Sequence, residues 1–116
     1  MVKYDVDAVA HAIASAPRRA VVDRLAQGPA SMTELAEVLG VTLSAVDKHL
    51  RVLLDAGMVT KRKDGRATVV TLNPGSLDDL ATWAMSTRLM WSGLLDRYVA
   101  AVDPTGPSPE TSKENP

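Results

Sequence analysis

The sequence of 116 residues contains no cysteine and no phenylalanine, and aromatic residues make up only 3% of it. Without cysteine the chain can form no disulfide, no thiolate metal site and no thiol redox centre. Without phenylalanine the core must be built from Val, Leu, Ala and Met. We expect so small an aliphatic core to gain from dimerisation, because association buries further apolar surface.

Long apolar runs are also missing. No stretch approaches the roughly 20 apolar residues that cross a bilayer, and the first residues are charged rather than apolar. We therefore expect a soluble, cytoplasmic protein with no membrane partner. The length fits one domain, predicted over 1–102. Residues 103–116 are rich in Pro, Ser, Thr and Glu and are predicted to form a disordered tail.

The residue patterns of common enzymes are absent from the sequence. There is no cysteine nucleophile, no Gly-x-Ser-x-Gly, no glycine-rich phosphate loop and no close pair of acids with a histidine. We therefore predict that the protein is not an enzyme and needs no cofactor.

The net charge of −1 does not suggest a nucleic-acid partner, but the distribution of charge does. Residues 41–72 contain six bases and three acids, which makes this segment +3 and leaves −4 for the rest of the chain. A basic patch on an acidic body is compatible with phosphate binding without indiscriminate attraction to polyanions.

Helical spacing of apolar residues predicts a first helix over 5–14 and a second over 18–27, with Pro17 in the first turn. Arg18 and Arg19 lie at the N-terminus of the second helix, where their charge opposes the helix dipole. This conflict is a hint of an external anion or of an acidic neighbour.

A short third helix is predicted to follow. Ser31 and Glu34 have the spacing of a capping box, and Gly40 suits the end of the helix. The helix is predicted to bury Leu35, Val38 and Leu39.

Residues 42–57 form a fourth helix, around which the prediction of function is built. Thr42 suits the N-cap, and Gly57 stands where the helix should stop. The predicted buried stripe consists of Val46, Leu50, Leu53 and Leu54. The opposite face carries Ser44, Asp47, Lys48 and Arg51. Two helices joined by a tight turn form a helix-turn-helix, and such a polar and basic face suits the major groove of DNA.

After Gly57 the pattern changes to that of strands. Segments 58–63 and 66–72 flank Asp64-Gly65, which is a strong signal for a two-residue hairpin turn. Four bases gather near its tip: Lys61, Arg62, Lys63 and Arg66.

Ser76 is expected to cap a long last helix. This helix is too apolar all round for a lone surface helix, so we expect it to pack on a partner subunit. The fold class is thus mainly α with a β-hairpin wing, a winged helix-turn-helix of five helices.

Several segments resemble the ArsR/SmtB family of winged-helix transcriptional repressors. The matching segments are Ala14–Arg19, Glu34–Glu37, Ser44–Leu53, Ala56–Val59 and Asp64–Arg66. Two positions depart from the family: Asp47 replaces the usual Ser, and Ser15-Ala16 replaces the usual Asp-Pro. The resemblance covers about residues 5–100. The last helix, with Trp83, Arg88, Trp91 and Leu95, is similar to a branch of the family without metal-binding cysteines.

The resemblance implies a homodimeric repressor that binds double-stranded DNA at an inverted-repeat operator. The implied DNA contacts on the fourth helix are Thr42, Ser44, Asp47, Lys48, His49 and Arg51. Those on the wing are the four bases named above. The dimer interface implied on the first and last helices consists of Val6, Val9, Ile13, Leu80, Trp83, Trp91, Leu95 and Tyr98.

Metal control, the best-known role of the family, is not expected here. The positions of its paired cysteines are Ala36 and Val38, and the last helix has no histidine. His11 is expected to be exposed or at the interface, and His49 to be half-buried. For Asp47 two roles stay open, a helical ion pair with Arg51 or a hydrogen bond from a cytosine amino group.

Two alternative functions remain. The first is a winged-helix adaptor that binds another protein, although such modules usually lose a basic wing. The second is a repressor released by a small apolar ligand at the dimer interface, for which Trp83, Met85, Met90 and Trp91 would line the pocket.

Overall fold

The computed structural model describes residues 5–102, so the predicted tail at 103–116 lies outside the described residues. Within them the elements are α1 (Val6–Ala12), α2 (Ala16–Leu25), β1 (Ala30–Ser31), α3 (Met32–Leu39), α4 (Leu43–Asp55), β2 (Val59–Asp64), β3 (Ala67–Leu72), a 3-10 helix η1 (Pro74–Leu77) and α5 (Asp78–Val102). The chain divides into two compact units, one ending at Ala81 and the other beginning at Thr82, and each is described by itself.

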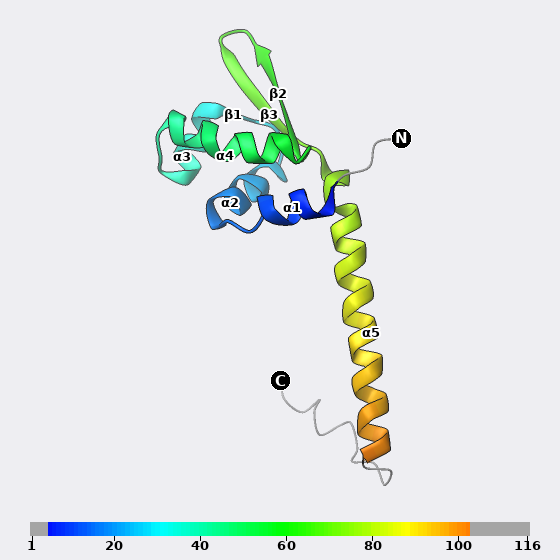
Figure 1. The fold of residues 1–116 in the computed structure, drawn as a ribbon. Coiled ribbons are helices and arrows are strands. Elements are labelled where there is room, and N and C mark those ends of the chain that lie inside the picture. The colour runs from blue at the N-terminus through cyan, green and yellow to red at the C-terminus, as the bar shows by residue number, and fades with distance from the viewer. Residues whose placement is uncertain (1–4, 103–116) are drawn as a thin grey trace. The chain divides into compact units, whose positions relative to one another are not determined.

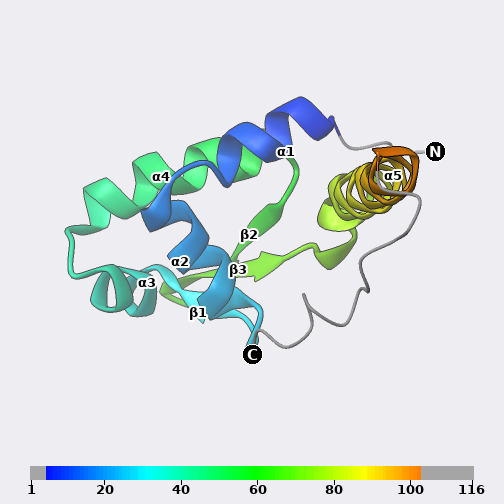
Figure 2. The same ribbon diagram turned by 90° about the horizontal axis from the view of Figure 1, so that it is seen from below.

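The core of the first unit is aliphatic, as predicted. Its largest buried side chains are Leu35, Leu50, Leu53, Met58, Val9, Val21, Val46 and Val70. They come from α1 to α4 and from the sheet; α1, α2 and α3 pack against α4, and α2 and α3 also pack against β3 (Figures 1 and 2). The core therefore fixes α4 against the other helices and against the first strand of the wing, which is the name used here for residues 59–72.

One core prediction is wrong. Val38 is 51% exposed, whereas Leu35 is buried and Leu39 is half-buried. Leu35 and Leu39 are one turn apart and together fill the inward side of the short helix α3, which leaves Val38 on its outer side.

The end of α1 explains the two arginines at the start of α2. Arg18 donates from Nε to the carbonyl oxygen of Ala12 at 2.6 Å and from Nη2 to that of His11 at 3.1 Å. Arg19 donates from Nη1 to the carbonyl oxygen of Ile13 at 2.8 Å. These carbonyls lie at a helix C-terminus, where cations are favourable. The partners of the two arginines are therefore backbone carbonyls, and not the external anion or acidic neighbour that the sequence suggested.

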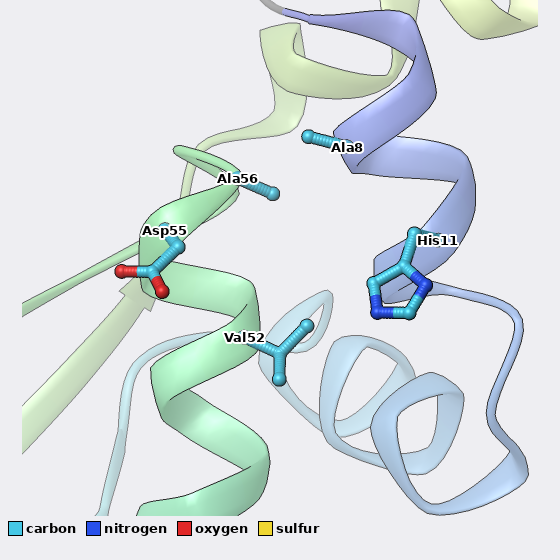
Figure 3. A pocket seen from close by; sticks show the side chains of 5 residues that line it. All are labelled: Ala8, His11, Val52, Asp55 and Ala56. Atoms are coloured by element: carbon cyan, nitrogen blue, oxygen red, sulfur yellow. The ribbon is translucent and has the colours of Figure 1, made fainter.

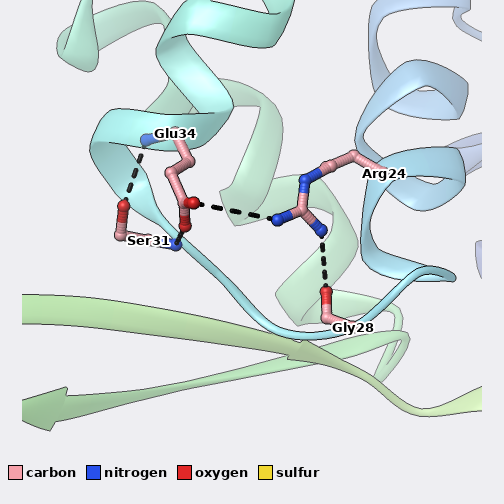
Figure 4. A network of polar contacts seen from close by, with 4 residues as sticks. All are labelled: Arg24, Gly28, Ser31 and Glu34. Carbon is pink, nitrogen blue, oxygen red and sulfur yellow. Dashed lines mark hydrogen bonds and ion pairs between the residues drawn. The ribbon is translucent and has the colours of Figure 1, made fainter.

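The predicted start of α3 is confirmed (Figure 4). The amide of Ser31 donates to Glu34 Oε1 at 2.8 Å, and the amide of Glu34 donates to Ser31 Oγ at 3.1 Å. Arg24 on α2 adds a second anchor, with Nη2 at 3.8 Å from Glu34 Oε2 and Nη1 donating to the carbonyl oxygen of Gly28 at 3.0 Å. The hydrogen bond from the Ser31 amide, aided by the Arg24 charge, holds the pKa of Glu34 below its ordinary value of 4.5.

The ends of α4 are also as predicted. The Thr42 hydroxyl accepts from the Ala45 amide at 3.1 Å, and Gly57 has a φ of 75°, which ends the helix in the left-handed region. Gly40, with a φ of 68°, makes the tight turn between α3 and α4. The two helices thus form the predicted helix-turn-helix.

The sheet is antiparallel, with strand order β1-β3-β2. Asp64 pairs with Ala67, so the two-residue turn is Gly65-Arg66 and not the predicted Asp64-Gly65. Of the two turn residues only Gly65 has a positive φ, which suits the first central position of a type II′ turn. The short strand β1 was not predicted; Ala30 and Ser31 pair with Val70 and Val69 and attach the wing to the start of α3.

The region before α5 differs from the prediction. Ser76 is buried and donates from Oγ to the carbonyl oxygen of Asn73 at 2.7 Å, so it closes the 3-10 turn and does not cap the last helix. Asn73 in turn donates from Nδ2 to the carbonyl oxygen of Gly57 at 3.0 Å. These bonds tie the end of β3 to the end of α4.

The helix α5 is 25 residues long and has no buried side chain. Its exposed large apolar residues are Trp83, Met85, Leu89, Met90, Trp91, Leu94, Leu95, Tyr98, Val99 and Val102. Among the residues that the structure describes, no helix is long and apolar enough to cross a membrane.

Candidate nucleic-acid interface

The exposed ridge of α4 follows directly from the burial of its other face. Val46, Leu50 and Leu53 have no exposed surface, and they fix how the helix is rotated about its axis. Ser44, Lys48 and Arg51 are consequently exposed. These residues are three and four apart and form one ridge on the outer side of the helix.

Asp47 lies at the edge of this ridge and is paired with two cations. Its Oδ2 accepts from Arg51 Nη2 at 3.1 Å, which confirms the predicted i, i+4 pair. Its Oδ1 lies 3.7 Å from Nζ of Lys61 on β2, a contact that was not predicted. The ridge and the wing therefore meet at one carboxylate.

The wing presents its bases to solvent. Every residue of β2 after Val59 is exposed, and so is Arg66 in the turn. Because side chains alternate along a strand, Lys61 and Lys63 point to one face and Arg62 to the other. Lys61, Arg62, Lys63 and Thr68 together line a shallow depression of about 300 Å³.

A second depression, of about 330 Å³, joins the wing to the starts of both helices of the helix-turn-helix. It is lined by Ser31, Met32, Thr33, Leu43, Arg66, Ala67 and Thr68. Thr33, Leu43 and Thr68 were not among the predicted site residues. The pairing of Ser31 with Val69 brings the start of α3, where Thr33 lies, to the wing, and such a long-range pairing leaves no signal in the local sequence.

Two predicted DNA contacts on α4 have other surroundings. The Thr42 hydroxyl is used as the helix cap, although the residue is exposed. His49 is half-buried, as predicted, and shares its side of the helix with the buried Val46 and Leu53. The structure thus places Ser44, Lys48 and Arg51 on one exposed ridge that meets the wing where Asp47 contacts Lys61, and it places His49 toward the buried side of the helix.

A small pocket of about 220 Å³ lies between α1 and the C-terminal end of α4 (Figure 3). It is lined by Ala8 and His11 of α1 and by Val52, Asp55 and Ala56 at the end of α4. His11 is exposed there. Across residues 5–102, no three His, Cys, Asp or Glu side chains gather closely enough to hold a metal ion.

The predicted interface residues of the first unit are largely covered by their own chain. Val9 is only 1% exposed and belongs to the core, so it is not available to a partner subunit, contrary to the prediction. Ile13 and Leu80 pack partly against the same core, and Val6 is half-buried. Trp83, Trp91, Leu95 and Tyr98 of α5 are exposed.

Comparison with known proteins supports the resemblance found in the sequence. Residues 13–62 match the model of a helix-turn-helix domain. The HTH-type transcriptional regulator Rv2034 of Mycobacterium tuberculosis is 39% identical over 95 residues, which are 82% of this chain and 86% of that protein.

Solved structures agree with this assignment. The crystal structure of an ArsR family transcriptional regulator, RHA00566, has a TM-score of 0.69 and 29% identity, and the match covers 79% of this chain and 97% of the other. A homodimeric winged helix-turn-helix DNA-binding domain from Mycobacterium bovis shares the fold, with a TM-score of 0.57 at 24% identity over 79% of this chain and 82% of the other. The chain therefore belongs to the ArsR family of winged helix-turn-helix transcriptional regulators.

Proposed function

We propose that the protein is a transcriptional repressor that binds an inverted-repeat operator as a homodimer. The observation that carries the proposal is that the exposed ridge of α4 and the basic wing meet at Asp47, whose carboxylate contacts both Arg51 and Lys61. The ridge suits the major groove, and the wing bases suit the adjacent phosphates. This is binding rather than catalysis, and it calls for no cofactor.

The homodimer is proposed from the apolar surface of α5. Tryptophan, tyrosine and leucine side chains exposed along one helix form a surface of the kind that subunits bury against each other. The M. bovis domain with the same fold is homodimeric. Two subunits would supply two copies of α4, and a two-fold axis between them corresponds to an operator with two-fold symmetry.

Selection of bound sequences from a random DNA pool tests both parts together. We expect an inverted repeat with half-sites centred about one helical turn apart, roughly 10 base pairs or a small multiple. Light scattering should give the mass of two chains. A monomer in solution, or a selected site without two-fold symmetry, would contradict the proposal.

A winged-helix adaptor for another protein is the competing function. The retained bases at Lys61, Arg62, Lys63 and Arg66 speak against it, because they are exposed and only Lys61 is engaged in an ion pair with another described residue. An adaptor would enrich no sequence from the DNA pool.

A further inference from the structure

Asp47 places a negative charge inside the proposed DNA-binding surface. Its two carboxylate oxygens bind different cations, Arg51 at 3.1 Å on the same helix and Lys61 at 3.7 Å on the first strand of the wing. Carboxylate and phosphate oxygens offer the same type of acceptor to a guanidinium or an ammonium group. In the free protein the carboxylate is thus the acceptor that lies between these two cations.

The two ion pairs are accessible to solvent and exchangeable. The side chains of Arg51, Asp47 and Lys61 are 71%, 41% and 34% exposed. Ion pairs in such surroundings contribute little to stability and are screened by salt. These ion pairs therefore add little to the stability of the fold. They do, however, occupy two cations that an incoming polyanion would otherwise bind.

A phosphate and a base edge would meet different conditions at this site. A phosphate attracted to Arg51 or Lys61 must approach the Asp47 carboxylate, and it is repelled by it. A base edge is neutral, and the guanidinium has five donors, of which only Nη2 bonds to Asp47. Arg51 can therefore keep Asp47 and still donate to a base, but it cannot keep Asp47 and neutralise a phosphate.

We propose that Asp47 is a specificity-determining residue that acts as an internal substitute for a DNA phosphate. It withholds Arg51 and Lys61 from the phosphates of random DNA and orients Arg51 for a base. The inference rests on the proposed DNA-binding function and deepens it.

The test compares two charge-neutralising variants of α4. Asp47→Asn removes the carboxylate with little change in size. Asp55→Asn makes the same change in charge on the same helix, at an exposed residue without an ion pair to another described residue. Affinity is measured at several salt concentrations for the selected site and for a random duplex of equal length, and circular dichroism confirms that both variants fold.

Asp47→Asn should bind random DNA roughly two- to twentyfold more tightly per subunit, because each exposed ion pair that must be broken weakens binding by up to about fivefold. The slope of log affinity against log salt should steepen by about 0.9 for each cation that is freed. The selected site should gain less, so the ratio of specific to random affinity falls. Asp55→Asn should leave that ratio unchanged.

A second variant isolates the contact with the wing. Lys61→Gln should reduce the salt slope by about 0.9 in the Asp47→Asn background and by clearly less in the wild-type background, where Lys61 is already paired. Equal reductions in the two backgrounds would overturn the role of Lys61. Equal effects of Asp47→Asn and Asp55→Asn, or equal gains on both duplexes, would overturn the inference while leaving the proposed function intact. A wild-type protein that selects no DNA sequence would overturn the proposed function itself.

Discussion

Arg18 and Arg19 are neighbours in the sequence but hold the end of α1 unequally. Arg18 is half-buried and bonds to two carbonyl oxygens, one of them on the buried Ala12, whereas Arg19 is exposed and bonds to one. A buried carbonyl that loses its donor is costly, and an exposed one can turn to water.

We therefore expect Arg18→Ala to lower the free energy of unfolding by about 1–3 kcal/mol, which is the range for hydrogen bonds to charged groups and for buried acceptors left without a partner. Arg19→Ala is the matched control and should lower it by about 0.5 kcal/mol or less, as is usual for surface substitutions. Urea denaturation followed by circular dichroism measures both. A loss at Arg19 as large as that at Arg18 would show that burial does not distinguish them.

Arg51 and Arg66 are predicted to contribute differently to DNA binding. Arg51→Ala should cost about 1–3 kcal/mol at the selected site and relax the preference at one base position. Arg66→Ala should weaken binding to all sequences similarly and reduce the salt slope by about 0.9, because it removes a phosphate contact. Binding curves on selected and random duplexes decide this. If each variant loses the same affinity for the selected duplex as for the random duplex, Arg51 does not read a base.

For single side chains, the sequence predicts contacts within one helix but not contacts between different elements. The pair of Asp47 with Arg51 follows from helical spacing alone. The contact of Asp47 with Lys61 depends on how β2 lies beside α4, and the bonds of Arg18 depend on where α1 ends. Neither position is encoded in nearby residues.

The N-terminus of α3 is held by both a capping box and a contact from another helix. Its capping box and the Arg24 contact both act on the charged form of Glu34, and they hold its pKa below 4.5. A carboxyl group with a lowered pKa in the folded state contributes stability above its ordinary pKa. That contribution is lost as the pH falls through the lowered value.

Glu34→Gln should therefore be less stable than the wild type at neutral pH, and the difference should disappear as the pH falls below 4.5. Glutamine can still accept the hydrogen bond of a capping box, so the helix itself should be retained. The measurement is urea denaturation of both proteins between pH 7 and about pH 3. A difference that persists unchanged at the acidic end would contradict the role of the charge.

The limits of element prediction are clearest in the sheet. Periodicity located both strands of the wing, but the turn was placed one residue too early because Asp-Gly is a common turn pair. Gly65 is the one turn residue with a positive φ, and this favours a turn in which it is the first central residue. The two residues of β1 are too few to show a periodic pattern, and they were missed.

The exposed apolar side chains of α5 form the proposed contact between the two subunits. Trp91→Glu should raise the dissociation constant of the proposed homodimer by at least about thirtyfold, because a buried tryptophan in an interface contributes 2 kcal/mol or more. Ser86→Glu adds the same charge to the same helix on another side and should leave the dimer intact. Sedimentation velocity at several protein concentrations separates the two outcomes. Dissociation by both variants would show a general effect of charge instead of a contact at Trp91.

The exposed wing has a further consequence, for colloidal stability. Within the described residues β2 bonds only to β3, so its outer edge has free backbone donors and acceptors. Such an edge can template pairing with strands of other molecules, and natural proteins commonly protect it with charged side chains, lysine above all. Lys61, Arg62 and Lys63 stand in a row on this edge. The side chains proposed to approach DNA would thus also keep two wings from joining into a continuous sheet when no DNA is bound.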